Sequence, residues 1–272
     1  MNLLPGVYTA KKKNGDIYFR SNITYRMKHI SLGSYATEEA AHKAYLTAHR
    51  ILEDPTVSPE ELLNTPERFS DLLFEKQICL VNFRDHNLYI ANPIYLRRHF
   101  FEYYLTEDIC LKFDIDDLFY YSSHKILMRN RHLCVADYGS QISLITRYGL
   151  KPYAVPGRDY LHLNQDPYDY RRINLEIINR YNGVHRIPYR NSYQYKAVIH
   201  IHGNYQIGIY DTEDEAAIAY NKAIDILRKK GVKKNFTPNF LDGLSPAVYA
   251  SIYSAIRISD KIIHFSPKGS LP

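Results

Sequence analysis

The chain carries one sequence pattern twice, once near each end, and this internal repeat constrains the fold more than any other feature. The matching positions are Gly6-Val7 with Gly183-Val184, Leu32-Gly33 with Ile207-Gly208, Tyr35 with Tyr210, and residues 37–45 with residues 212–220. The threonine and the tyrosine of the last stretch lie eight residues apart in both copies. A pattern repeated at this length indicates a repeated structural unit, so we expect two copies of one module.

The first part of each copy has the period of β-strands. In the second copy, residues 195–202 alternate, which indicates a half-buried strand. The pair Gly203-Asn204 then favours a hairpin turn, with residues 205–210 as the next strand. The face expected to be buried holds Ala197, Ile199 and Ile201, and the opposite face holds Lys196, Val198, His200 and His202.

The last part of each copy predicts a helix. Thr212 and Glu215 have the spacing of a capping box, so a helix is expected from there to about residue 230, with Gly231 ending it. Small side chains let this helix lie close to the sheet. They are Ala216, Ala219 and Ala223 in the second copy, and Ala40, Ala41 and Ala44 after the cap Thr37 in the first.

Positive charge is concentrated in the two copies. Residues 6–52 hold eight Lys and Arg against three Asp and Glu, and residues 180–235 hold ten against five, so each segment carries +5. The whole chain carries only +6, which leaves −4 for the remainder. Cationic side chains that neutralise phosphates release condensed counterions, so two basic segments favour a polyanionic ligand. A basic face that is merely solvated would not explain the pattern that both segments share.

The repeated module resembles the Apetala and ethylene-response-factor type of DNA-binding domain. The resemblance covers about 50 residues per copy and is strongest in the helix, where Thr212 to Tyr220 follows the family pattern. It implies a three-stranded antiparallel sheet that lies in the major groove of duplex DNA, with the helix packed behind. Several outward Arg and Trp positions of the family differ here, for example at His200 and Gln206, so the base preference is not carried over.

The residues expected to contact DNA are polar and basic side chains of the outward strand faces. Lys and Arg can anchor phosphates or read guanine, and Asn or Gln can read adenine. For each residue the alternative is an ordinary solvated strand position. They are Lys11, Lys12, Lys13, Tyr18, Arg20 and Asn22 in the first copy, and His185, Arg186, Arg190, Lys196, His200, Asn204 and Gln206 in the second.

The centre of the chain gives weaker signals. Residues 54–84 are expected to form a connection with a short helix, and residues 94–105 fit either a helix or a strand. Short strands are expected after Phe113, and a helix over 245–259 with its apolar side in the core. The expected strands cover residues 125–127, 132–136, 142–146 and 153–155.

Residues 160–184 resemble the HNH nuclease motif of homing endonucleases that carry the same DNA-binding module. The resemblance places His162 at the general base and Asn174 at the residue that orients it. It also places Leu161 where the family has a metal-binding carboxylate, and Thr146 where it has an upstream histidine. A leucine offers no lone pair to a metal, so we expect a vestigial nuclease without catalytic or metal residues. Asp159 or Asp166 moving in as a ligand keeps an active nuclease open.

These patterns predict an α+β protein with two sheet-plus-helix modules around a degenerate ββα centre. The expected segments are 5–53, 54–84, 85–180, 181–240 and 241–272. The expected function is sequence-specific binding of double-stranded DNA, as a transcriptional regulator without a cofactor. The alternatives are an active HNH nicking or homing endonuclease that uses magnesium, and an RNA-binding protein.

The expected compartment is the cytoplasm, with no membrane partner, and the nucleoid if the host is prokaryotic. No apolar run long enough for a signal peptide or a membrane span occurs. The three cysteines, Cys79, Cys110 and Cys134, lack the spacing of zinc sites or disulfide frameworks and are expected to be buried thiols. The oligomeric state, the target sequence and any effector stay open.

Overall fold

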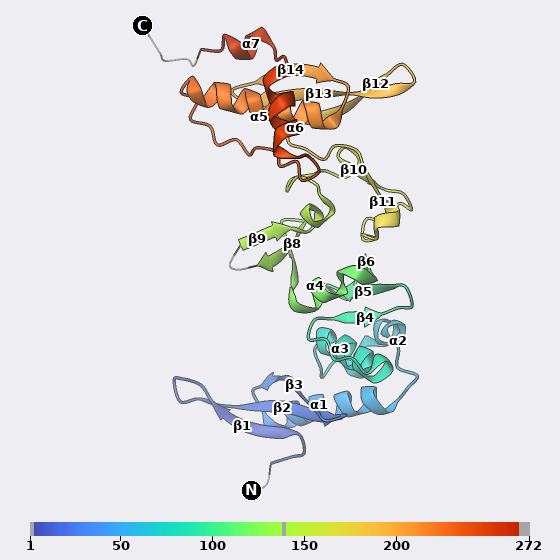
Figure 1. Ribbon diagram of the computed structural model, residues 1–272. Helices are drawn as coiled ribbons and strands as arrows, with labels where there is room; N and C mark the ends of the chain where they lie inside the picture. The colour runs from blue at the N-terminus through green and yellow to red at the C-terminus, as the bar shows by residue number, and fades with distance from the viewer. Residues whose placement is uncertain (1–2, 138–139, 267–272) are drawn as a thin grey trace. The chain divides into compact units, whose positions relative to one another are not determined.

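The computed structural model describes residues 3–137 and 140–266, and over this part of the chain the protein has the predicted α+β fold, with five small antiparallel sheets (Figure 1). Its internal contacts divide it into two compact units. The first comprises the chain up to Ile142 together with Asn164–Asn174, and the second comprises Ser143–Leu163 and the chain from Leu175 onward. Residues 85–180, expected as one central segment, are therefore shared between the units. No helix in the described part is long and apolar enough to cross a membrane.

The first unit begins with a three-stranded sheet and a helix, continues with short helices, and ends with two further sheets. Its strands are β1 (Val7–Lys11), β2 (Ile17–Tyr25), β3 (Lys28–Tyr35), β4 (Ile94–Leu96), β5 (Phe100–Tyr104), β6 (Cys110–Asp114), β7 (Ile126–Arg129), β8 (His132–Asp137) and β9 (Ser140–Ser143). Its helices are α1 (Glu38–Glu53), α2 (Pro59–Asn64), α3 (Phe74–His86) and α4 (Leu118–Ser123), with short 3-10 turns at Pro66–Phe69, Ile115–Asp117 and Arg172–Asn174.

The second unit contains a two-stranded ribbon, the second three-stranded sheet and its helices. Its strands are β10 (Tyr160–His162), β11 (Leu175–Ile177), β12 (Val184–Tyr189), β13 (Ser192–His200) and β14 (Asn204–Tyr210). Its helices are α5 (Glu213–Lys229), α6 (Pro246–Ala255) and α7 (Asp260–Ile263), and a 3-10 turn covers Leu144–Tyr148.

The internal repeat is a structural repeat. The sheet order is β1-β2-β3 in one copy and β12-β13-β14 in the other, and one helix packs on each sheet. Both predicted caps form: the Thr37 hydroxyl accepts a hydrogen bond from the Ala40 backbone, and Thr212 and Glu215 make the reciprocal capping box. The alanines predicted to approach the sheet are buried in the second copy, and Ala41 and Ala44 are buried in the first.

The repeat extends to irregular details of the backbone. Each central strand has a β-bulge at the same place, between Ser21 and Asn22 in the first copy and between Ala197 and Val198 in the second. Gly183 lies under the ring of Tyr220 with a φ of +69°, and a Cβ there would overlap that ring. Gly6 and Tyr45 repeat this contact in the first copy. The matched glycines and tyrosines therefore make the same packing contact in both modules.

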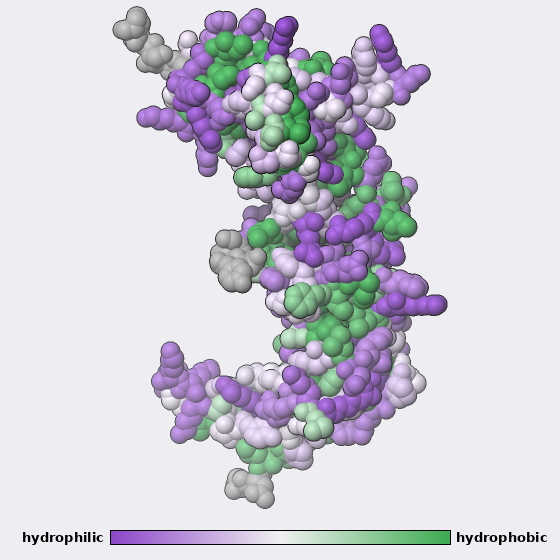
Figure 2. All heavy atoms as spheres, viewed as in Figure 1, coloured by the Kyte–Doolittle hydropathy of each residue, from purple (hydrophilic) through white to green (hydrophobic). Residues whose placement is uncertain are grey.

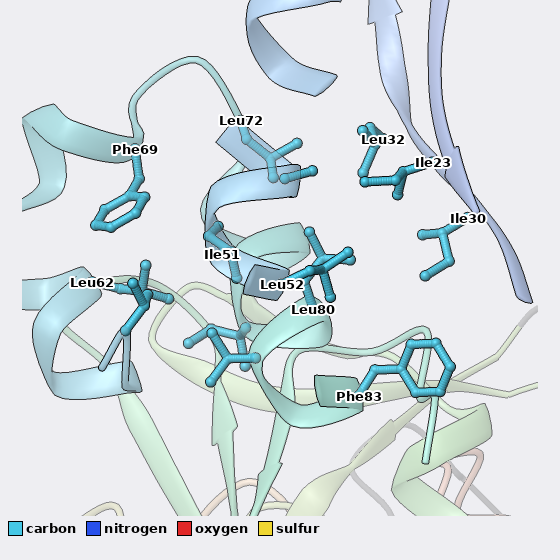
Figure 3. Close-up of a cluster of buried hydrophobic side chains, with 14 of the residues drawn as sticks. Ile23, Ile30, Leu32, Ile51, Leu52, Leu62, Phe69, Leu72, Leu80 and Phe83 are labelled. Carbon is cyan, nitrogen blue, oxygen red and sulfur yellow. The ribbon is translucent and has the colours of Figure 1, made fainter. Parts of the chain in front are cut away.

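The hydrophobic core of the first module continues into the helices that follow it. Ile23, Ile30 and Leu32 of the sheet point toward α1 and α3, while Leu62 and Phe69 close the other side (Figure 3). The buried guanidinium of Arg84 holds this arrangement, because it donates hydrogen bonds to the carbonyl oxygens of Ile51 (2.8 Å), Asp54 (2.6 Å) and Val57 (2.7 Å). These carbonyls lie at and after the end of α1, where a helix leaves acceptors unpaired.

Several sequence expectations about the connecting segments need correction. Residues 153–155 form no strand, because turns between Pro152 and Pro156 break the extended backbone. Strand β9 ends at Ser143, and the rest of the expected strand over 142–146 belongs to a 3-10 turn. The expected strand or helix over 94–105 is the strand pair β4 and β5. Of the cysteines, Cys79 and Cys134 are buried and Cys110 is half-buried.

The C-terminal helix also differs from the expectation. It ends at Ala255 rather than Ser259, and none of its residues is buried. It lies on α5 through polar contacts: the Tyr253 hydroxyl donates to Asp225 (2.8 Å), and the Lys222 ammonium donates to the carbonyl oxygen of Tyr253 (2.8 Å). The apolar residues with helical spacing therefore do not place this helix in the core, and Val248 and Ala255 among them are exposed.

Candidate nucleic-acid interface

The second sheet gathers most of the expected DNA-contacting residues of its module on one face. Ala197, Ile199 and Ile207 are buried in the core that the sheet shares with α5, so the intervening residues point away from the helix. The register pairs His185 with Lys196, Val198 with Gln206, and His200 with Asn204 across the strands. Because residues paired across antiparallel strands point to the same face, five expected residues share the outward face: His185, Lys196, His200, Asn204 and Gln206.

Two histidines of this face have defined surroundings. The His200 ring nitrogen Nδ1 lies 2.9 Å from the Asn204 amide oxygen, so the two side chains orient each other at the end of the sheet. Burial lowers the pKa of His185 below its usual value, and the nearby cations Lys151 and Arg158 lower it further. His185 is therefore a neutral ring at neutral pH, able both to donate and to accept a hydrogen bond.

The two arginines expected on this face lie elsewhere. Arg186 pairs with Tyr195, so it has the strand parity of the helix side, and its guanidinium lies 3.3 Å from Glu176 and over the Tyr193 ring. Arg190 occupies the β12–β13 turn with a φ of +53° and lies over the Tyr189 ring. The tip of this hairpin is hydrophilic (Figure 2). Arg190 can therefore reach a ligand only beside the sheet.

The first sheet has a comparable outward face. Tyr18, Arg20 and Asn22 lie on β2 opposite the direction of buried Ile23, and the Arg20 guanidinium donates to the Tyr18 hydroxyl (2.9 Å). The Arg20 cation also lies over the Tyr18 ring, with 5.6 Å to its centroid. These three expected residues are brought together as one polar and aromatic strip.

The three lysines expected beside this strip are not on the same face. Lys11 pairs with Ile17 at the end of β1 and shares its parity with buried Val7, so it points to the helix side. Lys12 and Lys13 lie in the turn between β1 and β2, which is hydrophilic in Figure 2. All three are exposed, and like Arg190 they form a basic hairpin tip.

The strand register adds residues that the sequence pattern did not single out. Tyr8 is opposite Arg20, Ser31 is opposite Asn22, and His29 is opposite Thr24, with 3.1 Å between the Thr24 hydroxyl and the His29 ring. Of these six residues, all except Asn22 are exposed, and Asn22 is half-buried. The bulge and Gly33 disturb the alternation of residues 28–35, which hides this face in the sequence. Only the cross-strand pairing reveals it.

The HNH-like motif is divided between the two compact units. His162 lies on β10 and pairs with Leu175 of β11, and its ring meets that of Tyr160 edge to face. Leu161 is partly exposed on the same strand, opposite Glu176. Asn174 ends the loop of residues 164–174 in the first unit, where its amide oxygen accepts from the Asn164 backbone (2.7 Å) and its amide nitrogen donates to the Asp169 carbonyl (2.9 Å). The Asn174 amide thus closes this loop.

The acidic residues considered as replacement metal ligands are held by cations. Asp166 lies 2.8 Å from the Lys112 ammonium, and hydrogen bonds from Lys112 and the Tyr168 backbone outweigh burial and lower its pKa. Buried Asp159 contacts Lys151 (2.9 Å) and Arg158 (2.7 Å). Within residues 3–137 and 140–266, no group of three His, Cys, Asp or Glu side chains is placed to hold a metal ion.

Comparisons of the chain with protein-family models, with curated proteins and with solved structures give no match.

Proposed function

We propose that the chain binds double-stranded DNA through the outward faces of its two three-stranded sheets. In this proposal each module is of the Apetala and ethylene-response-factor type, and the protein is a transcriptional regulator. Residues 85–180 are then a homing-endonuclease scaffold without nuclease activity. The observation that supports the proposal best is the shared outward face of His185, Lys196, His200, Asn204 and Gln206, opposite the helix.

The outward face of the second sheet has a shape that fits the major groove of DNA. An antiparallel ribbon fits the major groove of B-DNA, where Asn and Gln can read adenine and Lys can read guanine or bind phosphate. The hairpin tips with Lys12, Lys13 and Arg190 extend beyond the sheets, where they can reach backbone phosphates. Phosphate contacts position a protein and base contacts give specificity, so the faces and the tips have different expected roles.

Two modules in one chain also favour a bipartite site. Once one module is bound, the second contact is intramolecular, which raises affinity without new chemistry. We therefore expect a footprint with two halves, one read by each sheet.

The test is a binding titration on duplex DNA selected from a random pool. Lys196→Ala with His200→Ala should weaken binding by about tenfold or more and change the sequence preference, since each base contact is worth about 1–3 kcal/mol. The matched control is Lys229→Ala with His264→Ala, which removes the same residue types from exposed positions outside the sheet, at the end of α5 and directly after α7. Equal effects of the two pairs, or a salt dependence with a slope near zero, would remove the basis of the proposal.

A second candidate function is binding of single-stranded RNA. It is favoured by Tyr8 and Tyr18, which lie on the outward face of the first sheet and offer rings for base stacking. Stronger binding to a single-stranded RNA pool than to the duplex pool, lost in Tyr8→Ala with Tyr18→Ala, would favour this candidate.

A further inference from the structure

A groove of about 370 Å³ opens in the first module, between the sheet and α1. Its floor is formed by Gly6, Ile23 and Leu52, and its rim by polar side chains that include Thr24, His49 and Glu53. Pairing of β1 with β2 ends at Ser21, so the groove lies along the part of β2 that β1 does not cover. His49 and Glu53 lie 2.8 Å apart, and both side chains are substantially exposed.

The structural repeat identifies the counterpart of this groove in the second module. The matching tyrosines Tyr45 and Tyr220 set the alignment of the two helices, which places Ile224 where the first module has His49 and Arg228 where it has Glu53. The two sheets align in the same way: Thr24 pairs with His29 across the strands of the first module, and His200 pairs with Asn204 at the matching place in the second.

In the second module this place is filled by the chain itself. After α5, residues 232–241 run without helix or strand, and Phe236 is buried in the module's core. Two contacts locate the segment: the Lys234 ammonium donates to the His200 carbonyl (2.8 Å), and the Arg228 guanidinium donates to the Phe236 carbonyl (3.2 Å). His200 and Arg228 are the counterparts of Thr24 and Glu53, which form the rim of the open groove.

The C-terminal end of residues 232–241 is also held by hydrogen bonds. Asn239 exchanges hydrogen bonds with Asn221 of α5 (2.7 and 2.9 Å) and with the backbone of Asn182 (2.7 and 3.1 Å). The segment therefore passes along the groove from the end of the sheet to the residue before Gly183. In the first module the chain after α1 enters α2 instead, and no segment of the described part of that unit takes this place.

We propose that the groove of the first module binds an extended segment of a partner protein, anchored by one aromatic side chain with basic residues next to it. The aromatic anchor follows from Phe236, the side chain that fills the counterpart. The basic residues of the partner segment are inferred from charge complementarity, because the rim of the first groove has the acidic Glu53 where the second module has Arg228. The internal segment of the second module also carries Lys233 and Lys234 before its phenylalanine. This inference does not rest on DNA binding.

The experiment uses the full chain and a labelled synthetic peptide with the sequence of residues 231–242. In a fluorescence anisotropy titration the peptide should bind saturably. The peptide with Phe236→Ala should lose about tenfold or more in affinity, because the aromatic side chain is the group that becomes buried. The peptide with Lys233→Glu and Lys234→Glu should also bind more weakly.

The chain variant Glu53→Lys should weaken binding of the original peptide several-fold. Its matched control is Glu67→Lys, the same charge reversal at an exposed position outside the groove, which should leave binding unchanged. A urea titration of each variant verifies that the fold is intact. Equal binding by both variants overturns the proposal. A second outcome would also overturn the proposal. In that outcome Glu53→Lys leaves peptide binding unchanged but raises the affinity for duplex DNA more than Glu67→Lys does, which would assign the groove to a nucleic-acid surface.

Discussion

The substitution Asp159→Asn tests how the second unit is held together. Asp159 is fully buried and accepts hydrogen bonds from the Val155 backbone (2.8 Å) and Arg158 (2.7 Å), with the Lys151 ammonium 2.9 Å away. The two cations differ in how far they are buried, and therefore in how much each ion pair is expected to contribute to stability. The Lys151 side chain is 8% exposed, whereas that of Arg158 is 55% exposed. Asparagine leaves the Lys151 charge buried without its carboxylate, which costs about 3–5 kcal/mol.

The control is Arg158→Ala, which breaks an exposed ion pair to the same carboxylate and should cost about 1 kcal/mol or less. Urea denaturation at pH 7, followed by tyrosine fluorescence and circular dichroism, measures both variants. A loss below about 1 kcal/mol for Asp159→Asn, or one equal to that of Arg158→Ala, would refute the assignment of the stability to the buried Lys151–Asp159 pair.

The pH dependence adds a second check. Burial raises the pKa of Asp159, but the hydrogen bonds from Arg158 and Lys151 outweigh it, so the pKa in the folded protein is below the ordinary value of 3.8. The unfolded chain then binds the proton first, so the stabilisation is complete above about pH 4 and is lost as the pH falls through the folded pKa. The stability difference between the wild type and Asp159→Asn should shrink only below about pH 4.

Three further predictions concern the second module. Phe236→Ala should lower its free energy of unfolding by about 3–5 kcal/mol, because a buried aromatic ring leaves a cavity, and chemical denaturation measures it. Thr212→Ala should cost about 1 kcal/mol through loss of the capping box, while Thr212→Ser should restore most of it. For His185, the lowered pKa means that the unfolded chain takes up a proton first, so stability should fall as the pH drops from 7 through about 6.5. His185→Gln should flatten this part of the profile of urea midpoint against pH; an unchanged profile would assign the dependence to another group.

The sequence predicts the modules well because local chemistry determines them. The alternation, the turn and the cap at Thr212 each act within a few residues. The cap is confirmed, and so is the strand as far as His200, but the chain turns earlier than predicted, at residues 201–203, and Asn204 already begins β14. The faces of the sheets could be predicted only where alternation is regular. Lys196 and His200 lie on the expected face, whereas Arg186 and Lys11 do not, because the register with the partner strand decides their direction.

Helix α3 shows why the central part could not be predicted. Its N-cap residue, Leu73, makes no side-chain capping bond, and every residue from Gln77 to Arg84 is buried. A helix enclosed on several sides has no polar face, so it lacks the period by which amphipathic helices are found. The role of Arg84 depends on three carbonyl oxygens about 30 residues earlier in the chain, which no local pattern encodes.

The shared core of the first module and α3 has a consequence for how the duplicated unit can be reused. The hydrophobic core of the second copy is completed by residues that directly follow it in the chain, from Phe236 to Ile262. The stretch that begins near Tyr181 therefore contains its own core. The first copy depends on Leu62, Phe69 and Leu80, and a chain cut after Glu53 would expose Ile51 and Leu52 to water. We therefore expect the second copy with the residues that follow it to fold as an isolated fragment, whereas a fragment that ends with the first copy should not.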